Sequence, residues 1–276
     1  SALQALEDND TDHPQAKLQR LFSKALDDST QRKMCLTDDE HIRVSSCGSR
    51  GASLYLVGPI SYDEMLSEFF FDSIAFTTAI RLRLGMTVRS NTMDLCDLCH
   101  REHAMGEFGH GALACMRCGR RVRAHNALRD HLAKVCRDAL ITPTIEPRLT
   151  ADTAMRGDIA IRMSGALWII DVAITHPFAQ ENRSAALSGG AGGAATAYQA
   201  VKVKKYASLL PKSSVLVPFV VDTFGALGEA AIEALQKIVP HYARRLGITS
   251  TVASRVVFGR ITTSVIKSMA LIAAQG

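Results

Sequence analysis

The chain has 276 residues, 47% of them hydrophobic, and a formal net charge of +5. This length and apolar content exclude a disordered or fibrous chain and favour one large globular domain with appendages over two equal domains. The longest run without charged residues, 184–201, is rich in Gly, Ser and Ala, so we expect a soluble intracellular protein with no membrane-spanning segment.

The charge is unevenly distributed along the chain. Residues 1–40 contain nine Asp and Glu against five Lys and Arg, whereas residues 115–137 contain seven Lys and Arg against one Asp. A mild positive excess is compatible with an anionic partner such as nucleic acid, and the basic charge is concentrated in the second of these segments.

The N-terminal part of the chain has few regular patterns. Residues 1–50 are polar and rich in turn formers, and we expect one short helix over about 15–26 and otherwise loop. A longer helix is predicted over roughly 61–84, because Ser61 can cap it and Gly85 can end it. Residues 93–120 show little periodicity, so we expect a metal rather than an apolar core to hold them.

The rest of the chain predicts a mixed α/β fold. Apolar residues at 128, 132, 135 and 139 form a helical stripe, and three strand-like segments follow, TPTIEP, GDIAIRM and ALWIIDVAIT. The glycine-rich SGGAGGAATA predicts a mobile loop. We then expect a helix at about 196–210, the strand SVLVPFVVDT, and two helices near 226–246 and 250–274. The predicted order is α-β-β-β-α-β-α-α.

These patterns divide the chain into three parts. They are an N-terminal linker and helical extension (1–92), a zinc-binding segment (93–120), and an α/β domain (121–276).

The cysteines favour a zinc site over disulfides. Five of the seven lie between positions 96 and 136 with histidines among them, and a CxxC turn supplies two thiolates from one tight loop. Zinc needs four ligands, and two sets that share Cys115 fit the spacing. They are Cys96, Cys99, His110 and Cys115, or Cys115, Cys118, His131 and Cys136. Spacing alone does not choose between them.

The segment RGDIAIRMSGALWIIDVAITHP, residues 156–177, places Asp171 inside an apolar run. In a strand, Asp171 shares one face with Ile169 and Ala173, flanked by apolar positions. An unpaired carboxylate there is costly, so it requires a cation, a hydrogen-bond network or a metal. A tight turn at MSG brings Asp158 beside Asp171, and two converging carboxylates predict a site for Mg²⁺ or Mn²⁺.

The helix AYQAVKVKKYASLL carries Tyr198, Lys202, Lys205 and Tyr206 on one face. A run of lysines usually marks a solvent-exposed face of a helix. A lysine beside a carboxylate-bound metal, however, can orient water and offset charge on a phosphate. Because of Asp158 and Asp171, we favour the catalytic interpretation.

These motifs resemble the PD-(D/E)XK nuclease superfamily, in the variant whose lysine lies on the helix after the second core strand. Ala173 stands where the usual lysine would be, so Lys202 replaces it, and Gly157 stands where proline is usual. More narrowly, the ordered motifs resemble the C-terminal part of non-LTR retrotransposon polyproteins that carry a restriction-like endonuclease, over residues 47–276. They are CDLC, FGHGALAC, RVRAHNALRD, EPR, RGDIAI, WIIDVAITHP, KVKKY and VPFVVDTFGALGEAAIEAL.

The resemblance implies a restriction-endonuclease-like core (α-β-β-β-α-β) with C-terminal helices. It implies a nuclear enzyme that nicks DNA and exposes a 3′-hydroxyl for priming reverse transcription, with element RNA and the reverse transcriptase region of the same polyprotein as further partners. Asp158 and Asp171 would bind Mg²⁺ with Glu146 as a third acid, and Lys202 would orient the attacking water. Lys205 and Tyr206 would face the scissile phosphate or a structural neighbour.

The same resemblance favours the first zinc set, a knuckle formed by Cys96, Cys99, His110 and Cys115. His125 matches the histidine of a conserved His-Asn pair in that family, and the basic side chains beside it would grip DNA phosphates. These are Arg117, Arg120, Arg121 and Arg123. Two other hypotheses stay open: a nucleic-acid-binding zinc protein that keeps the nuclease fold without its chemistry, and a zinc-stabilised scaffold within a larger assembly.

Overall fold

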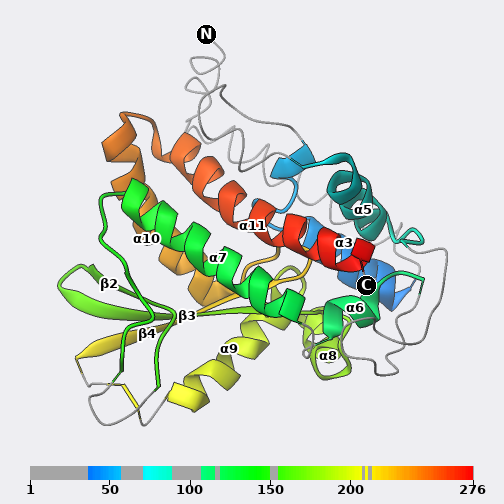
Figure 1. Cartoon of the computed structure of the whole chain (residues 1–276), viewed down its shortest axis with the longest axis horizontal. Coiled ribbons are helices and arrows are strands. Elements are labelled where there is room, and N and C mark those ends of the chain that lie inside the picture. The colour runs from blue at the N-terminus through cyan, green and yellow to red at the C-terminus, as the bar shows by residue number, and fades with distance from the viewer. Residues whose placement is uncertain are drawn as a thin grey trace, which may run out of the picture.

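A four-stranded mixed sheet lies at the centre of the fold, with helices on both faces (Figure 1). The computed structural model describes residues 37–56, 71–88, 107–115, 119–149, 155–206, 209–210 and 213–275. The predicted helix over 15–26 lies outside these residues. The predicted single helix over 61–84 was wrong in its start, because α5 (Ser73–Leu84) begins after Asp72, whose side chain caps it. The strands are β1 (Thr144–Ile145), β2 (Ile159–Met163), β3 (Ala166–Thr175) and β4 (Ser214–Asp222). The predicted mixed α/β class is confirmed.

The strands lie in the order β1-β2-β3-β4, with the first three forming the antiparallel meander expected from the sequence. β4 runs parallel to β3, because α8 (Gln180–Gly189) and α9 (Gly193–Tyr206) carry the chain back between them. β3 is paired with β4 along its whole length but with β2 only up to Ile170. The end of β3 therefore extends past β2.

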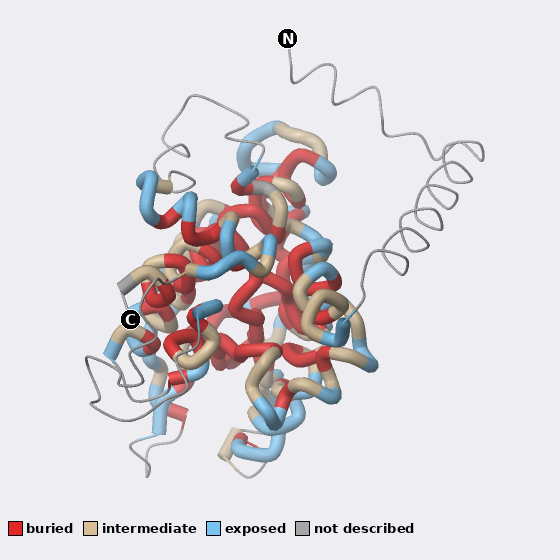
Figure 2. Tube along the Cα trace, turned by 90° about the vertical axis from the view of Figure 1, so that its right-hand side faces the viewer, coloured by how far each residue is buried: buried red, intermediate tan, exposed pale blue. Residues whose placement is uncertain are grey.

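Alternation along β3 divides the core in two, as its period of two predicts. Trp168, Ile170, Val172 and Ile174 pack into the large core. Two helices cover that face, α7 (Gly119–Asp138) and α10 (Glu229–Leu246), and α11 (Ser250–Gln275) packs against both of them. The opposite face packs against α9, where Ile169 meets Tyr206 and Ala173 meets Ala195. Figure 2 shows the buried residues concentrated at the centre of the molecule.

α11 is long and apolar enough to cross a membrane, over Ser250–Ala274, but 83% of its most hydropathic window is buried inside the protein. It packs against α5 (Ser73–Leu84), α7 and α10. Its apolar composition therefore fits a central core helix. Arg260 is buried within it and donates to Asp138 at 2.7 Å.

Three of the described helices, α3, α8 and α6, were not expected from the sequence. α3 (Asp38–Cys47) occupies a stretch predicted as loop, and it begins at a capping box in which Thr37 and Glu40 each bind the other's backbone N–H. α8 was also missed, since it has no side-chain cap at Ala179. α5 ends at Gly85 in the left-handed conformation, as predicted. The remaining elements are η1 (Leu54–Leu56) and α6 (His110–Ala114).

The prediction of a mobile loop at SGGAGGAATA was wrong in extent, because only residues 190–192 separate α8 from α9. Gly190 and Gly192 have positive φ values of 59° and 81°, which glycine adopts without strain. A Cβ at Gly192 would lie 2.3 Å from the carbonyl oxygen of Leu227. The glycines thus form a tight turn against the chain, and the alanines after them begin α9.

Gly157 occupies a buried position where the resemblance implied proline. Its N–H donates to the Pro147 carbonyl oxygen at 3.1 Å, a bond that proline lacks the hydrogen to make. A Cβ on Gly157 would lie 2.7 Å from Ile169 Cγ2. The hydrogen bond excludes proline, and the close packing against Ile169 favours glycine at the entrance to β2.

We predict that Gly157→Ala lowers the free energy of unfolding by about 1–3 kcal/mol, because the new methyl group forces Ile169 from its position. Gly189→Ala is the matched control, since a Cβ there meets nothing within 4 Å. Urea denaturation measures both. Equal stability of the two variants would contradict the proposed packing.

Candidate active site

Three acidic residues lie in one row across the sheet: Glu146 directly after β1, Asp158 directly before β2, and Asp171 within β3. The register pairs Ile145 with Ile159 and Ile159 with Ile170. One step further along, Glu146 lies opposite Asp158, and the Asp158 N–H donates to the carbonyl oxygen of Ile170, the residue before Asp171, at 3.2 Å. The N–H of Glu146 donates to the Asp158 carbonyl oxygen at 3.0 Å, consistent with this pairing. We call Glu146, Asp158 and Asp171 the acid row.

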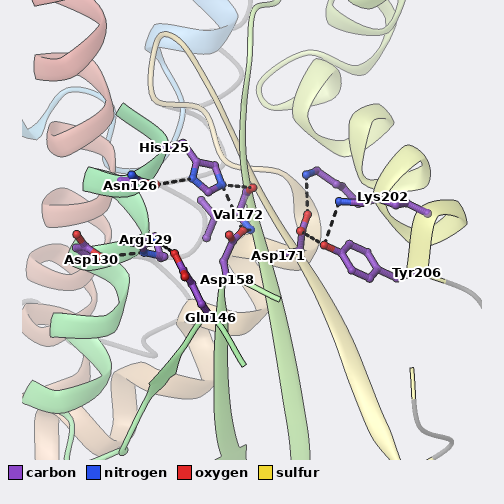
Figure 3. A network of polar contacts seen from close by, with 11 residues as sticks. His125, Asn126, Arg129, Asp130, Glu146, Asp158, Asp171, Val172, Lys202 and Tyr206 are labelled. Carbon is purple, nitrogen blue, oxygen red and sulfur yellow. Dashed lines mark hydrogen bonds and ion pairs between the residues drawn. The ribbon is translucent and has the colours of Figure 1, made fainter. Parts of the chain in front are cut away.

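Asp171 is buried in the face of β3 that α9 covers, and α9 supplies both of its partners (Figure 3). The Lys202 ammonium lies 2.6 Å from Asp171 Oδ2, and the Tyr206 hydroxyl donates to Oδ1. Burial and the bond to Asp171 raise the pKa of Tyr206, so its hydroxyl stays protonated and acts as a donor. Two of the predicted catalytic side chains therefore contact Asp171 directly.

Lys205 lies one step from this contact. Its ammonium donates to the Tyr206 hydroxyl at 3.2 Å and lies 4.7 Å from the centre of the Tyr206 ring. Lys205 itself is exposed. Lys205 is therefore connected to Asp171 only indirectly, through the Tyr206 hydroxyl.

Asp158 is held from the other side of the sheet, by α7. Its Oδ2 accepts the N–H of Val172 at 2.6 Å and lies 3.3 Å from His125 Nε2. Burial raises the pKa of Asp158, but the bond and charge of His125, the Val172 N–H and the charge of Lys202 outweigh it, and the net pKa is lowered. Asp158 is therefore ionised at neutral pH.

His125 connects α7 to the acid row through its contact with Asp158. The bond to Asp158 is the largest cause of a raised pKa for the ring, followed by burial, which opposes it. Nε2 also lies 3.1 Å from the Val172 carbonyl oxygen, an acceptor only, so this nitrogen carries the hydrogen. Nδ1 lies 3.3 Å from Asn126 Oδ1.

Glu146 is the most exposed member of the acid row. Arg129 Nη1 donates to Glu146 Oε1 at 2.7 Å, and Arg156 lies 3.7 Å from Oε2. Sequence reasoning missed Arg129, although its spacing was informative: it follows His125 by four residues and so shares its helix face. Both residues of α7 face the acid row.

The end of β3 that passes β2 has backbone groups with no strand to pair with. Thr175 accepts from Thr223 on the β4 side, so by alternation Val172 and Ile174 point their backbone groups the other way. Asp158 accepts the Val172 N–H, and His125 donates to the Val172 carbonyl oxygen. Arg121 donates to the Ile174 carbonyl oxygen at 2.6 Å. Side chains thus replace the missing strand.

The four arginines expected to hold DNA are placed differently. Arg121 is buried and also donates to the Leu113 carbonyl oxygen, so it ties α7 to α6 and to β3. Arg123 is exposed and Arg120 is half-buried on the same helix. Arg117 lies outside the described residues. Arg120 and Arg123 are therefore the predicted phosphate contacts that remain accessible.

The predicted zinc ligands are only partly within the described residues. Cys96, Cys99 and Cys118 lie outside them. His110 and Cys115 lie at the two ends of α6, with the His110 ring stacked 4.3 Å from that of Phe178. Burial, with help from the charge of Arg43, lowers the pKa of His110 to about 4, which keeps the imidazole neutral, the form that binds metal.

The alternative zinc set also lies only partly within the described residues, because Cys118 is outside them. His131 Nδ1 lies 2.7 Å from the Ala127 carbonyl oxygen, and Cys136 is buried in the core, where burial raises the pKa of its thiol to about 12. Within the described ranges, no group of three or more His, Cys, Asp or Glu side chains could hold a metal ion, the acid row included, and both zinc sets stay predictions.

The sequence matches no model of a known protein family and no curated protein. Any function must therefore be argued from the acid row and its neighbours.

We predict that Tyr206→Phe lowers the free energy of unfolding by about 1–3 kcal/mol, because it leaves a buried carboxylate oxygen of Asp171 without its donor. The matched control is Tyr198→Phe on the same helix, whose hydroxyl has no hydrogen-bond partner among the described residues. Urea denaturation compares the two. A smaller effect at Tyr206 than at Tyr198 would show that this bond does not stabilise the fold.

The pair formed by His125 and Asp158 should stabilise the fold most at mildly acidic pH. The contribution of His125 is complete below its ordinary pKa of 6.5 and is lost as pH rises through its raised pKa. The contribution of Asp158 is present above its ordinary pKa of 3.8 and is lost as pH falls through its lowered pKa.

We therefore expect His125→Gln to lower the free energy of unfolding by about 1 kcal/mol near pH 5.5 and by less near pH 9, where histidine is neutral like glutamine. Chemical denaturation at the two pH values measures the difference. A loss that is the same at both would mean that charge on His125 contributes nothing.

Proposed function

We propose that this protein is a metal-dependent DNA endonuclease of the restriction-like type. The observation that carries the proposal is the 2.6 Å contact of Lys202 on α9 with the buried Asp171 of β3, near Asp158, whose pKa the charge of Lys202 helps to lower. All three are charged groups whose side chains are at most 19% exposed, and a fold seldom buries such groups without a reason. Paired carboxylates with a lysine suit the hydrolysis of a phosphodiester bond.

The residues fit a Mg²⁺ or Mn²⁺ ion. Such an ion is commonly bound through one or two carboxylates and keeps several waters, so Asp158 and Asp171 would hold it without a third protein ligand. Glu146 joins as an outer acid when Arg129 and Arg156 release it. When bound, the ion supplies a water of lowered pKa and stabilises negative charge on the phosphate.

The protein's own side chains would position the reacting groups. The Lys202 side chain is mostly buried, and its ammonium lies beside Asp171. From there it can orient the attacking water or bind a phosphate oxygen. Tyr206 holds Asp171 in place as a hydrogen-bond donor. His125 holds Asp158 against the backbone of Val172. These contacts restrict both carboxylates before DNA arrives.

The finer expectations belong to the same proposal. The order of α7, the meander, α9, β4 and the C-terminal helices is compatible with a restriction-endonuclease-like core. A zinc knuckle would precede it, with His110 and Cys115 as two of its ligands. In that setting the nick would expose a 3′-hydroxyl for reverse transcription in the nucleus, with element RNA and a reverse transcriptase region as partners.

One observation favours the second hypothesis, a nucleic-acid-binding protein that keeps the fold without the chemistry. Lys202 and Tyr206 already contact both oxygens of Asp171, and His125 and Val172 both contact Oδ2 of Asp158. An acid row neutralised by the protein itself needs no ion. Nicking activity separates the two hypotheses.

We predict Mg²⁺-dependent nicking of supercoiled plasmid that falls at least about 100-fold in Asp158→Asn, Asp171→Asn and Lys202→Met. The asparagine variants keep the shape of the side chain and remove its charge. The readout is the rate of conversion to open circles, with circular dichroism to confirm folding.

Glu233→Gln on α10 is the control for loss of an acid, because Glu233 is exposed and outside the acid row. It should nick at the wild-type rate. Wild-type nicking by both asparagine variants would refute the proposal, and DNA binding without any nicking by the wild-type protein would favour the non-catalytic hypothesis.

A further inference from the structure

A cleft of about 220 Å³ opens where β3 passes the end of β2. α7 forms one wall with Val122 and His125, and α9 forms the other with Tyr198 and Lys202. The floor is the segment of β3 from Val172 to Ile174, which has no neighbouring strand on the β2 side. Figure 3 shows the same arrangement, with His125 and Lys202 on opposite sides of the strand. The cleft therefore begins one residue beyond Asp171.

The lining of the cleft combines an aromatic ring, apolar side chains and hydrogen-bond donors. Tyr198 is partly exposed, and Val122 is 59% exposed on the facing helix. Lys202 and His125 carry N–H groups, and the Ile174 N–H points to the same edge by the alternation of β3. A ligand that complements this lining would have a flat apolar surface to lie against Tyr198 and Val122, and oxygen atoms to accept the hydrogen bonds.

The size of the cleft decides how much of such a ligand enters. At about 220 Å³ it is smaller than the roughly 300–1,000 Å³ of sites that enclose a drug-sized molecule. A base pair within a duplex has its faces covered by its neighbours, so only an unstacked base can lie against Tyr198. The fitting unit is one nucleotide that projects from a strand.

We propose that this cleft binds a single unstacked nucleotide next to the phosphate that is cut. The inference rests on the proposed function, because the acid row defines where the cut lies. The base lies between Tyr198 and Val122, and its phosphate lies toward Lys202 and His125. Binding is tolerant of sequence, because every base has a face that stacks. The protein therefore prefers DNA that is already unpaired at this position.

The test uses a fluorescein-labelled twelve-residue thymidine oligonucleotide and a labelled duplex of the same length, with Ca²⁺ in place of Mg²⁺ so that binding is measured without cleavage. Fluorescence anisotropy gives the dissociation constants. Tyr198→Ala should weaken binding of the single strand roughly 10-fold, and Tyr198→Phe should restore it, because the ring rather than the hydroxyl stacks.

Val122→Trp tests the cleft itself by filling it. We expect a similar loss of single-strand affinity with much less effect on the duplex, which charged surface residues bind through phosphates. Val203→Trp is the control, because Val203 is 50% exposed on α9 and does not line the cleft. Thermal unfolding confirms that both variants fold.

Wild-type single-strand affinity in Val122→Trp would overturn the inference, and so would an equal loss for both DNAs. These results are independent of the nicking assay. A protein that nicks through Asp158 and Asp171 but binds single strands normally after Val122→Trp retains the proposed function and loses the cleft. A protein that never nicks but loses single-strand binding in Val122→Trp has the opposite outcome, a nucleotide cleft on a non-catalytic fold.

Discussion

The carboxylate of Asp171 is the constraint on which the rest of this structure depends. It lies within a sheet, where an ionised group without a partner costs several kcal/mol. α9 supplies that partner, since Lys202 and Tyr206 lie one helical turn apart and reach the same carboxylate. This contact fixes the rotation of α9 on the sheet. The small residues that begin the helix, such as Ala195, then allow it to pack closely.

A second constraint is the unequal length of the strands. β3 continues after β2 has ended, and its exposed backbone needs donors and acceptors. Asp158, His125 and Arg121 provide them. Because these are side chains rather than a strand, they leave space beside β3, and that space is the cleft. The acid row and the cleft therefore have one structural origin, the place where the meander ends and two helices meet.

Local patterns predicted much of the fold. The alternation through Asp171 identified both faces of β3, and Gly85 was identified as the end of a helix from its position after an apolar stretch. Patterns failed where a long-range contact outweighed composition. The glycines near Gly192 suggested a mobile loop, yet the backbone of Leu227 packs against that glycine and fixes a tight turn. The capping box of α3 could be recognised from Thr37 and Glu40, but it was missed because the surrounding segment is acidic and polar and was interpreted as loop.

The sequence by itself determined the chemical elements of the site: a buried aspartate, a second acid before a strand, and a lysine helix. These follow from periodicity, which depends only on neighbours in the chain. Tertiary structure decided which groups meet. Arg121 and Arg123 have the same side chain and lie on the same helix. Arg121 is nevertheless buried and donates to carbonyl oxygens, whereas Arg123 faces solvent. His125 and Asp158 are paired for the same reason, because contacts between distant segments are set by how the helices pack on the sheet.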